Sequence, residues 1–425
     1  MPAPLPELQL IIMEAFVAEH FVDLPFKGGF VMKSKNMFIL FISLIVVMMG
    51  YGIAMPVLPF YIDSFGGRGI HYGLLIACYG MMQLLFAPVW GSLSDKYGRK
   101  PMLLIGMVGL GTAMFLFALA TQLWMLYLAQ LLSGSLSSAT LPAAQAYAAD
   151  STTKEERGAA MGKIGGAIGI GVILGPGLGG LLASMSLATP FFIASAFCLL
   201  TFLIILAGLP ESLANEQRAE SAEIKIMQLK GSWQMLFTPI GFGLATAFVA
   251  IFGQTIFSSV FGLYALARFD YGPEQVGTIL MAMAFMYALA QGLIVGPLTK
   301  KFGEAKIIVL ATLGCSLGFV LILLAHTFLT ILLAVSCFIL INSMLKPSAL
   351  AFISKHASGN QGQAMGVAES YMSLGRIAGP LWGGMIFDVN IFYPFLSGII
   401  ILFIAFLLTL RKMVQGNSRQ YEITN

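Results

Sequence analysis

Ionisable side chains inside long apolar segments are the residues whose types and spacing suggest chemistry in this chain. Glu369 is the one acid well inside such a segment, and Lys346 and Arg376 are cations at comparable depth. Glu369 and Arg376 are seven residues apart (376 − 369), which is two helical turns, so they share a helix face. A carboxylate there can pair with a cation and release it on binding a proton. We therefore take these three residues as ion-coupling candidates, with a purely structural ion pair as the alternative.

Further polar and aromatic side chains are scattered through the apolar segments. Amide and aromatic groups in an apolar surrounding suit bulky amphipathic ligands. Each of them could equally be a hydrogen-bonding contact between two helices. The candidates for a substrate-binding wall are Tyr79, Gln83, Phe86, Trp90, Gln145, Gln254, Tyr287, Gln291 and Asn342.

Catalytic and metal-binding patterns are weak. The four histidines are dispersed without an H-E-x-x-H motif, and the four cysteines show no C-x-x-C spacing. Residues 314–318 match G-x-S-x-G, but they lie within an apolar helical segment rather than at a strand-to-helix turn. We therefore expect no enzyme, no metal and no cofactor. A membrane enzyme or a non-transporting sensor is the alternative class.

The composition indicates the elements that must position these residues. The chain is 58% hydrophobic and 10% charged, with a mean hydropathy of +0.88, whereas soluble proteins are about 25% charged. Its 47 glycines favour helices that pack closely in lipid. The net charge of +4 is too small and scattered for a nucleic-acid partner. We predict an all-α membrane protein, a monomer whose partners are the bilayer and a small-molecule substrate.

Twelve apolar stretches are long enough to cross a membrane, because a spanning helix needs about 20 residues. A polar segment after the sixth stretch indicates a linker between two halves. The predicted division is an N-terminal extension at 1–36, a first half at 37–209, a linker at 210–238, a second half at 239–412 and a tail at 413–425. The predicted spans are 38–62, 72–93, 102–121, 124–148, 158–184, 190–209, 239–266, 276–298, 306–325, 329–353, 362–386 and 391–410.

The distribution of cations predicts the orientation, because cytoplasmic loops are rich in Lys and Arg. With the N-terminus inside, only Arg68 and Arg268 fall in outer loops, and Lys346 and Arg376 lie within spans. The other 19 cations (23 less these four) are cytoplasmic. We expect both termini in the cytoplasm and the chain in the inner (plasma) membrane. Residues 8–22 are too short and acidic to span, so we expect a surface helix or tail there, with a start at Met32 as the alternative.

The two halves repeat each other. The charged loop after the second span, from Gly91, reappears after the eighth from Gly296, 205 residues later (296 − 91). The glycine-rich segment at 175–180 reappears at 379–384, 204 residues later (379 − 175). A repeat of six helices points to a transporter with its site between the halves.

The first charged loop has the composition of a conformational latch. Two glycines permit a tight turn, and charges of both signs lie at helix ends, where they can stabilise one conformation. We expect Arg99 to pair with Asp95 and with Asp150, although a simple excess of cytoplasmic cations would explain the basic residues alone. The predicted latch comprises Gly91, Asp95, Gly98, Arg99, Lys100 and Asp150.

The loop at 91–100 resembles the G-x-L-x-D-x-x-G-R-K signature of the major facilitator superfamily. The G-P-x-x-G-G segment, with Gly175, Pro176, Gly179 and Gly180, resembles a signature of its exporter branch, and 55–59 and 72–101 are similar to bacterial tetracycline and multidrug proton antiporters. The resemblance covers about 37–412. It implies the major facilitator fold, proton-coupled export of small amphipathic molecules, and a role for 175–180 in the contact that closes the inward side.

The chain departs from these relatives where they carry ionisable groups. Glu369 therefore remains the candidate residue for the proton coupling that the resemblance implies. Export of an anionic metabolite or siderophore is the alternative function, and the two intramembrane cations favour it. Residues at the departing positions are Val47, Ala113, Gln130, Ser258, Tyr287, Gly314 and Ser343, whereas Gln291 and Lys346 match.

Overall fold

A computed structural model describes residues 35–153, 155–213, 232–236, 238, 240–357 and 361–424. The N-terminal extension, with the alternative start at Met32, and most of the linker lie outside the described residues. Every regular element in the described part is helical. This agrees with the all-α prediction, because a backbone in lipid must satisfy its own hydrogen bonds within each segment.

The first half contains six helical stretches at the predicted positions. The fourth is interrupted by the 3₁₀ turn η1, where Ser138 Oγ donates to the Ser135 carbonyl at 2.8 Å. Serine bonds of this kind compete with the helical ladder. The elements are α2 (Lys35–Ser64), α3 (Gly69–Tyr97), α4 (Arg99–Ala118), α5 (Leu123–Leu136), η1 (Ser137–Ala139), α6 (Thr140–Asp150), α7 (Arg157–Ala183) and α8 (Thr189–Gly208).

The second half repeats this order after the short helix α9 (Ser232–Met235). Its second stretch contains a π-helical turn, η3. The last helix continues to Thr424, into the predicted tail at 413–425, and no proline interrupts it. The elements are α10 (Gly241–Phe269), α11 (Pro273–Leu289), η3 (Ala290–Ile294), α12 (Val295–Phe302), α13 (Glu304–Leu324), α14 (Phe328–His356), α15 (Gln361–Phe387) and α16 (Tyr393–Thr424).

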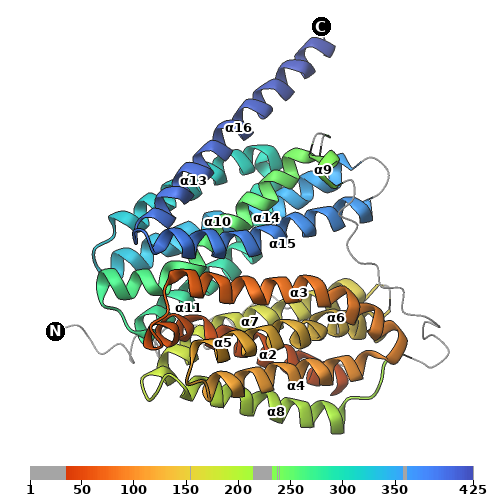
Figure 1. The fold of residues 1–425 in the computed structure, drawn as a ribbon. Coiled ribbons are helices and arrows are strands. Elements are labelled where there is room, and N and C mark those ends of the chain that lie inside the picture. The colour runs from red at the N-terminus through yellow and green to blue at the C-terminus, as the bar shows by residue number, and fades with distance from the viewer. Residues whose placement is uncertain are drawn as a thin grey trace.

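The two halves form two layers of helices (Figure 1). Within the halves, α2 packs on α7 as α10 packs on α15. Between them, the main contacts are α3 with α15 and α7 with α11. Ten helices of the described part are long and apolar enough to cross a membrane by length and composition. The equivalent contacts in the two halves show that the internal repeat of the sequence is also a repeat of helix packing.

Candidate functional site

The two halves touch most closely near the start of α3. A Cβ on Gly73 would overlap the Pro380 carbonyl oxygen, and its nearest approach to Gly384 Cα would be 3.3 Å. The repeat places the same contact between α7 and α11, where a Cβ on Gly277 would lie 2.6 Å from the Pro176 carbonyl oxygen and 3.0 Å from Gly180 Cα. Only glycine permits helix backbones to approach so closely. We call this region the Gly73 end.

The G-P-x-x-G-G segment of α7 has two packing faces. Gly175 contacts α2, where a Cβ would lie 2.7 Å from Gly52 Cα, and Gly179 packs on the Ile53 backbone. Gly180 instead faces α11, where a Cβ would lie 2.6 Å from the Pro273 carbonyl oxygen. The segment thus joins α2 and α11 at the Gly73 end. The segment and the charged loop at 91–100 thus lie at opposite ends of the bundle, and its expected role in closing the inward side stays a prediction.

At that other end, which we call the Arg99 end, the same helix faces are uncovered. A Cβ added to the α7 glycines between positions 162 and 169 would meet no atom within 4 Å, and the same holds for glycines at this end of the three facing helices. The α7–α11 and α3–α15 contacts therefore part towards the Arg99 end. The uncovered glycines are Gly162, Gly165, Gly166 and Gly169 on α7, Gly91 on α3, Gly292 and Gly296 on the second stretch of the second half, and Gly366 on α15.

The ion-coupling candidates lie between these two ends. Glu369 Oε1 accepts a hydrogen bond from Arg376 Nη2, so the pair predicted from the seven-residue spacing is present. The Glu369 side chain is 56% exposed and that of Arg376 is 35% exposed. Glu369 is thus not enclosed by protein. It shares its helix face with Pro380, which reaches α3, so it lies where the two halves have parted.

Within the described residues, one atom of this pair and one neighbouring cation have no hydrogen-bond partner. Arg376 Nε is buried without a hydrogen-bond acceptor. Lys346 on α14 interacts electrostatically with Glu369 and Arg376, but it forms no ion pair or hydrogen bond within the described part. Two cations and one carboxylate leave this cluster with a net positive charge.

Some predicted wall residues lie near the cluster. Tyr79 packs against Tyr51 with ring centroids 5.2 Å apart, and both rings lie in the neighbourhood of Arg376. Gln291 Nε2 donates to the Ser343 carbonyl at 2.9 Å and bonds to Tyr287. Gln83 and Gln254 are not among the buried residues of the bundle.

Asn342 is a different case. Its side chain is 3% exposed, and its Nδ2 donates to the Ala250 carbonyl at 3.4 Å. It therefore joins α14 to α10 inside the second half, and its prediction as a wall residue is wrong. A buried amide between helices satisfies its donors in this way.

The predicted partners of Arg99 are in place. Arg99 Nη1 lies 2.6 Å from Asp95 Oδ1, and Nε lies 2.9 Å from Asp150 Oδ2. Nη1 also donates to Ser94 Oγ at 3.1 Å. Gly98 has φ +106°, a conformation that side chains disfavour, which allows α4 to begin directly after α3. The guanidinium thus joins the ends of α3 and α6.

Glu211 completes this corner and was not expected from the sequence. Its carboxylate accepts from the backbone N–H groups of Arg99 at 2.8 Å and Lys100 at 3.1 Å, at the start of α4. It also accepts from those of Ser212 and Leu213. The four N–H groups at a helix start lack helical partners, so a carboxylate there is favourable. The available signal for Glu211 was its position directly after Pro210, at the end of a predicted span.

The second half has its own charged corner. Lys355 Nζ lies 2.5 Å from Glu304 Oε1, joining α14 to the start of α13. Glu304 corresponds to Arg99 (304 − 99 = 205) and Lys355 to Asp150 (355 − 150 = 205), so the repeat offset could have revealed this pair. The two charges are exchanged between the halves.

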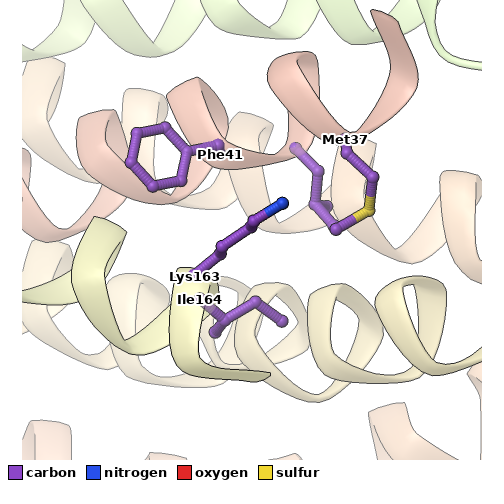
Figure 2. A pocket seen from close by; sticks show the side chains of 5 residues that line it. Met37, Phe41, Lys163 and Ile164 are labelled. Atoms are coloured by element: carbon purple, nitrogen blue, oxygen red, sulfur yellow. The ribbon is translucent and has the colours of Figure 1, made fainter. Parts of the chain in front are cut away.

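A small hollow between α2 and α7 lies near the Arg99 end. It is lined by Met37, Leu40, Phe41, Lys163 and Ile164, and Figure 2 shows the Lys163 amine reaching between Phe41 and Met37. None of these residues belongs to the predicted sites. The hollow lies within the first half, so it is separate from the contacts between the halves.

Comparisons with known proteins agree with this architecture. The family model of the Major Facilitator Superfamily matches residues 40–272 and 243–422. Multidrug resistance protein 2 of Bacillus subtilis (strain 168) is 34% identical over 383 residues, covering 89% of this chain and 95% of that protein. Quinolone resistance protein NorA of Staphylococcus aureus (strain COL) is 28% identical over 380 residues, covering 87% of this chain and 96% of that protein.

Solved structures share the fold at low identity. A point mutant of the nucleoside transporter NupG has a TM-score of 0.77 at 15% identity, covering 89% of this chain and 99% of that one. A point mutant of the peptide transporter POT, solved with sulfate, has a TM-score of 0.73 at 16% identity, covering 92% of this chain and 96% of that one. At these identities the likeness concerns the arrangement of the helices alone.

Proposed function

Because the chain belongs to the major facilitator superfamily, we propose that it is a multidrug efflux transporter that exports small amphipathic molecules by alternating access. One observation carries this proposal. The halves are in backbone contact at the Gly73 end, while the facing glycines at the Arg99 end are uncovered. A molecule could therefore reach the central cluster from the Arg99 end alone, and rocking of the halves would move this access to the Gly73 end.

We place the Arg99 end in the cytoplasm, since the excess of Lys and Arg lies in the loops at that end. The membrane is then the plasma membrane, and substrates enter from inside the cell. The relatives named for multidrug and quinolone resistance support efflux as the direction. The proposed unit of transport is the single chain with a small-molecule substrate, acting as a transporter and not as an enzyme.

Proton antiport through Glu369 is the proposed coupling. Its carboxylate pairs with Arg376 and reaches the space where the halves have parted, so a proton that neutralises it would release the guanidinium. A proton gradient of one pH unit supplies about 1.4 kcal/mol per proton, enough for about a tenfold substrate gradient. Protonation of Glu369 would also remove a negative charge that interacts with Lys346, and deprotonation would restore it.

Reconstituted liposomes test the proposal. Liposomes that contain the protein should accumulate a fluorescent amphipathic dye when a pH gradient is imposed, and collapse of the gradient should stop this uphill transport. Glu369→Gln keeps the size of the side chain and removes its titration, so it should still exchange dye but not concentrate it. The matched control is Glu156→Gln before α7, the same chemical change at an exposed acid away from the cluster. Uphill transport by Glu369→Gln at the wild-type level would place the coupling elsewhere.

Export of an anionic metabolite or siderophore is the second candidate function. The cluster favours it because Lys346 lacks an ion-pair partner in the described part and Arg376 Nε lacks an acceptor. An organic anion would supply that acceptor. Lys346→Met should then abolish transport of carboxylate substrates while sparing a neutral or cationic dye. Equal loss for both kinds of substrate would reject the anionic candidate.

A further inference from the structure

Asp388 connects the two halves directly. It follows the last residue of α15 in the second half, and its carboxylate reaches the first turn of α3 in the first half. Oδ1 accepts from the backbone N–H of Gly69 at 2.7 Å, and Oδ2 accepts from that of Ile70 at 3.0 Å. These hydrogen bonds join residues 319 and 318 positions apart in the chain.

The contact is a helix cap supplied by another part of the molecule. The first N–H groups of a helix have no partner within it, and their partial positive charge attracts an anion. The preceding N–H of Arg68 is satisfied locally by His71 Nδ1 at 2.9 Å. The next two depend on Asp388. Gly69 allows this approach, since a Cβ there would lie 3.0 Å from Asp388 Oδ1 and 2.9 Å from the Gly384 carbonyl oxygen.

The repeat-related contact between α7 and α11 is built differently. The position that corresponds to Asp388 is Ser184 (388 − 184 = 204), whose Oγ donates to Leu181 within its own half at 2.6 Å. The position that corresponds to Gly69 is Pro273 (273 − 69 = 204), which has no N–H to be capped. The α7–α11 contact has the glycine packing of its counterpart but not its cap, because Ser184 Oγ is used within its own half and Pro273 has no N–H.

We propose that Asp388 is a polar lock that holds the Gly73 end closed and is released each time that end opens. Its two partners move with the first half and Asp388 moves with the second, so separation of the halves at this end must break both hydrogen bonds. The Asp388–Ile70 hydrogen bond is solvent-exposed, so water can replace each partner after separation. The lock therefore biases the equilibrium without preventing opening. This holds whatever the substrate and the coupling ion are.

Distances between spin labels at both ends of the bundle test the lock. One pair carries labels at Met185 in the first half and Leu329 in the second, both strongly exposed at the Gly73 end. The other carries labels at Glu156 and Lys301, exposed at the Arg99 end. Four native cysteines are first replaced by alanine. Pulsed electron paramagnetic resonance spectroscopy of the protein in nanodiscs then gives the populations of short and long label-to-label distances at each end.

Asp388→Asn removes the charge and one of the two acceptors, so it should raise the ratio of the long to the short distance at the Gly73 end about fivefold to tenfold. The distance at the Arg99 end should shorten in parallel. Asp388→Ala, which removes both acceptors, should shift the ratio at least as far. Ser184→Ala, at the repeat-related position, and Asp63→Asn, which removes another exposed acid from this end, should leave both distributions unchanged.

Two outcomes would overturn the lock. If Asp388→Asn and Asp388→Ala melt at lower temperature but keep the wild-type distance populations, Asp388 is a structural cap alone. If Asp63→Asn shifts the populations as far as Asp388→Asn, the effect is one of net charge. The labels report conformation without substrate or proton gradient, so the lock can hold when no transported molecule is found. Failure of the efflux proposal is thus a separate result.

Discussion

The charged corners of the two halves occupy the same positions of the repeat but differ in polarity and burial. Arg99 pairs with Asp150 in the first half, and Glu304 pairs with Lys355 in the second. The Arg99 side chain is 9% exposed and has two carboxylate partners, whereas Lys355 is 63% exposed and has one among the described residues. A repeat can therefore preserve the position of an ion pair while its charges are exchanged, because the attraction depends on the product of the charges.

The chain around each corner explains the difference in burial. The segment after α8 turns back and brings Glu211 onto the start of α4. In the second half, α16 continues as a helix through the equivalent position, residue 416 (211 + 205). A Cβ on Gly98 would overlap the Glu211 carboxylate, and one on Gly303 would meet nothing within 4 Å. The connection between the halves thus makes the first corner a closed network.

Removal of Arg99 should have the largest effect. Arg99→Ala leaves Asp95 and Asp150 without their cation and should cost about 1.5–3 kcal/mol of stability, the range for hydrogen bonds to charged groups, because the side chain of Asp95 is 59% exposed and stays solvated. Transport at matched protein levels should fall severely. Thermal unfolding in detergent and dye efflux measure the two effects, with Lys355→Ala as the comparison. Equal losses for the two variants would show that the corners are equivalent.

The next largest effect should be the difference in stability between alanine variants of Gly98, which precedes α4, and Gly303, which precedes α13. Gly98→Ala and Gly303→Ala both place a side chain at positive φ (+106° and +78°), which costs about 1 kcal/mol at each position. Gly98→Ala must also displace Glu211, so its melting temperature should fall further and its efflux should be slower. A melting temperature of Gly98→Ala no lower than that of Gly303→Ala would show that Glu211 adjusts without cost.

Loss of the Glu211 charge should have an intermediate effect. Glu211→Gln keeps one acceptor for the start of α4 and should cost about 1–2 kcal/mol, the range for a lost N-terminal cap. Hydrogen exchange of the Arg99 and Lys100 amides should accelerate, which localises the change to the helix start. Glu156→Gln, an exposed acid before α7, is the control. Unchanged hydrogen exchange at these two amides would show that Glu211 does not stabilise the start of α4.

The smallest effect should come from the second corner. Lys355→Ala should cost about 0–1 kcal/mol, because an exposed ion pair contributes little. Glu304→Lys combined with Lys355→Glu restores a pair of the polarity found in the first half and should melt within about 1 kcal/mol of the wild type. Each single reversal should melt lower than the double variant. A double variant less stable than both single variants would show that polarity is fixed by other groups.

Local patterns predicted part of the candidate site. The seven-residue spacing indicated the Glu369–Arg376 pair because both residues lie on one helix. The motif at 91–100 indicated the Asp95 partner of Arg99, four residues away. Glu211 and Asp388 were missed because their partners lie 112 and 319 residues away, across segments whose path the sequence does not specify. Asn342 was misplaced because helical spacing does not say which neighbour covers a polar face.

The helices, their apolar character and the repeated helix order could be predicted from the order of the residues, although ten rather than twelve helices of the described part are long and apolar enough to cross a membrane. These features follow from local hydropathy and repeated spacing, since each helix satisfies its backbone hydrogen bonds within its own segment. The packing of the whole chain was needed to show that the glycines near Gly73 meet between halves while those near Gly162 do not. The same small residues can line a closed contact or an open one, because contact depends on how two distant surfaces are placed.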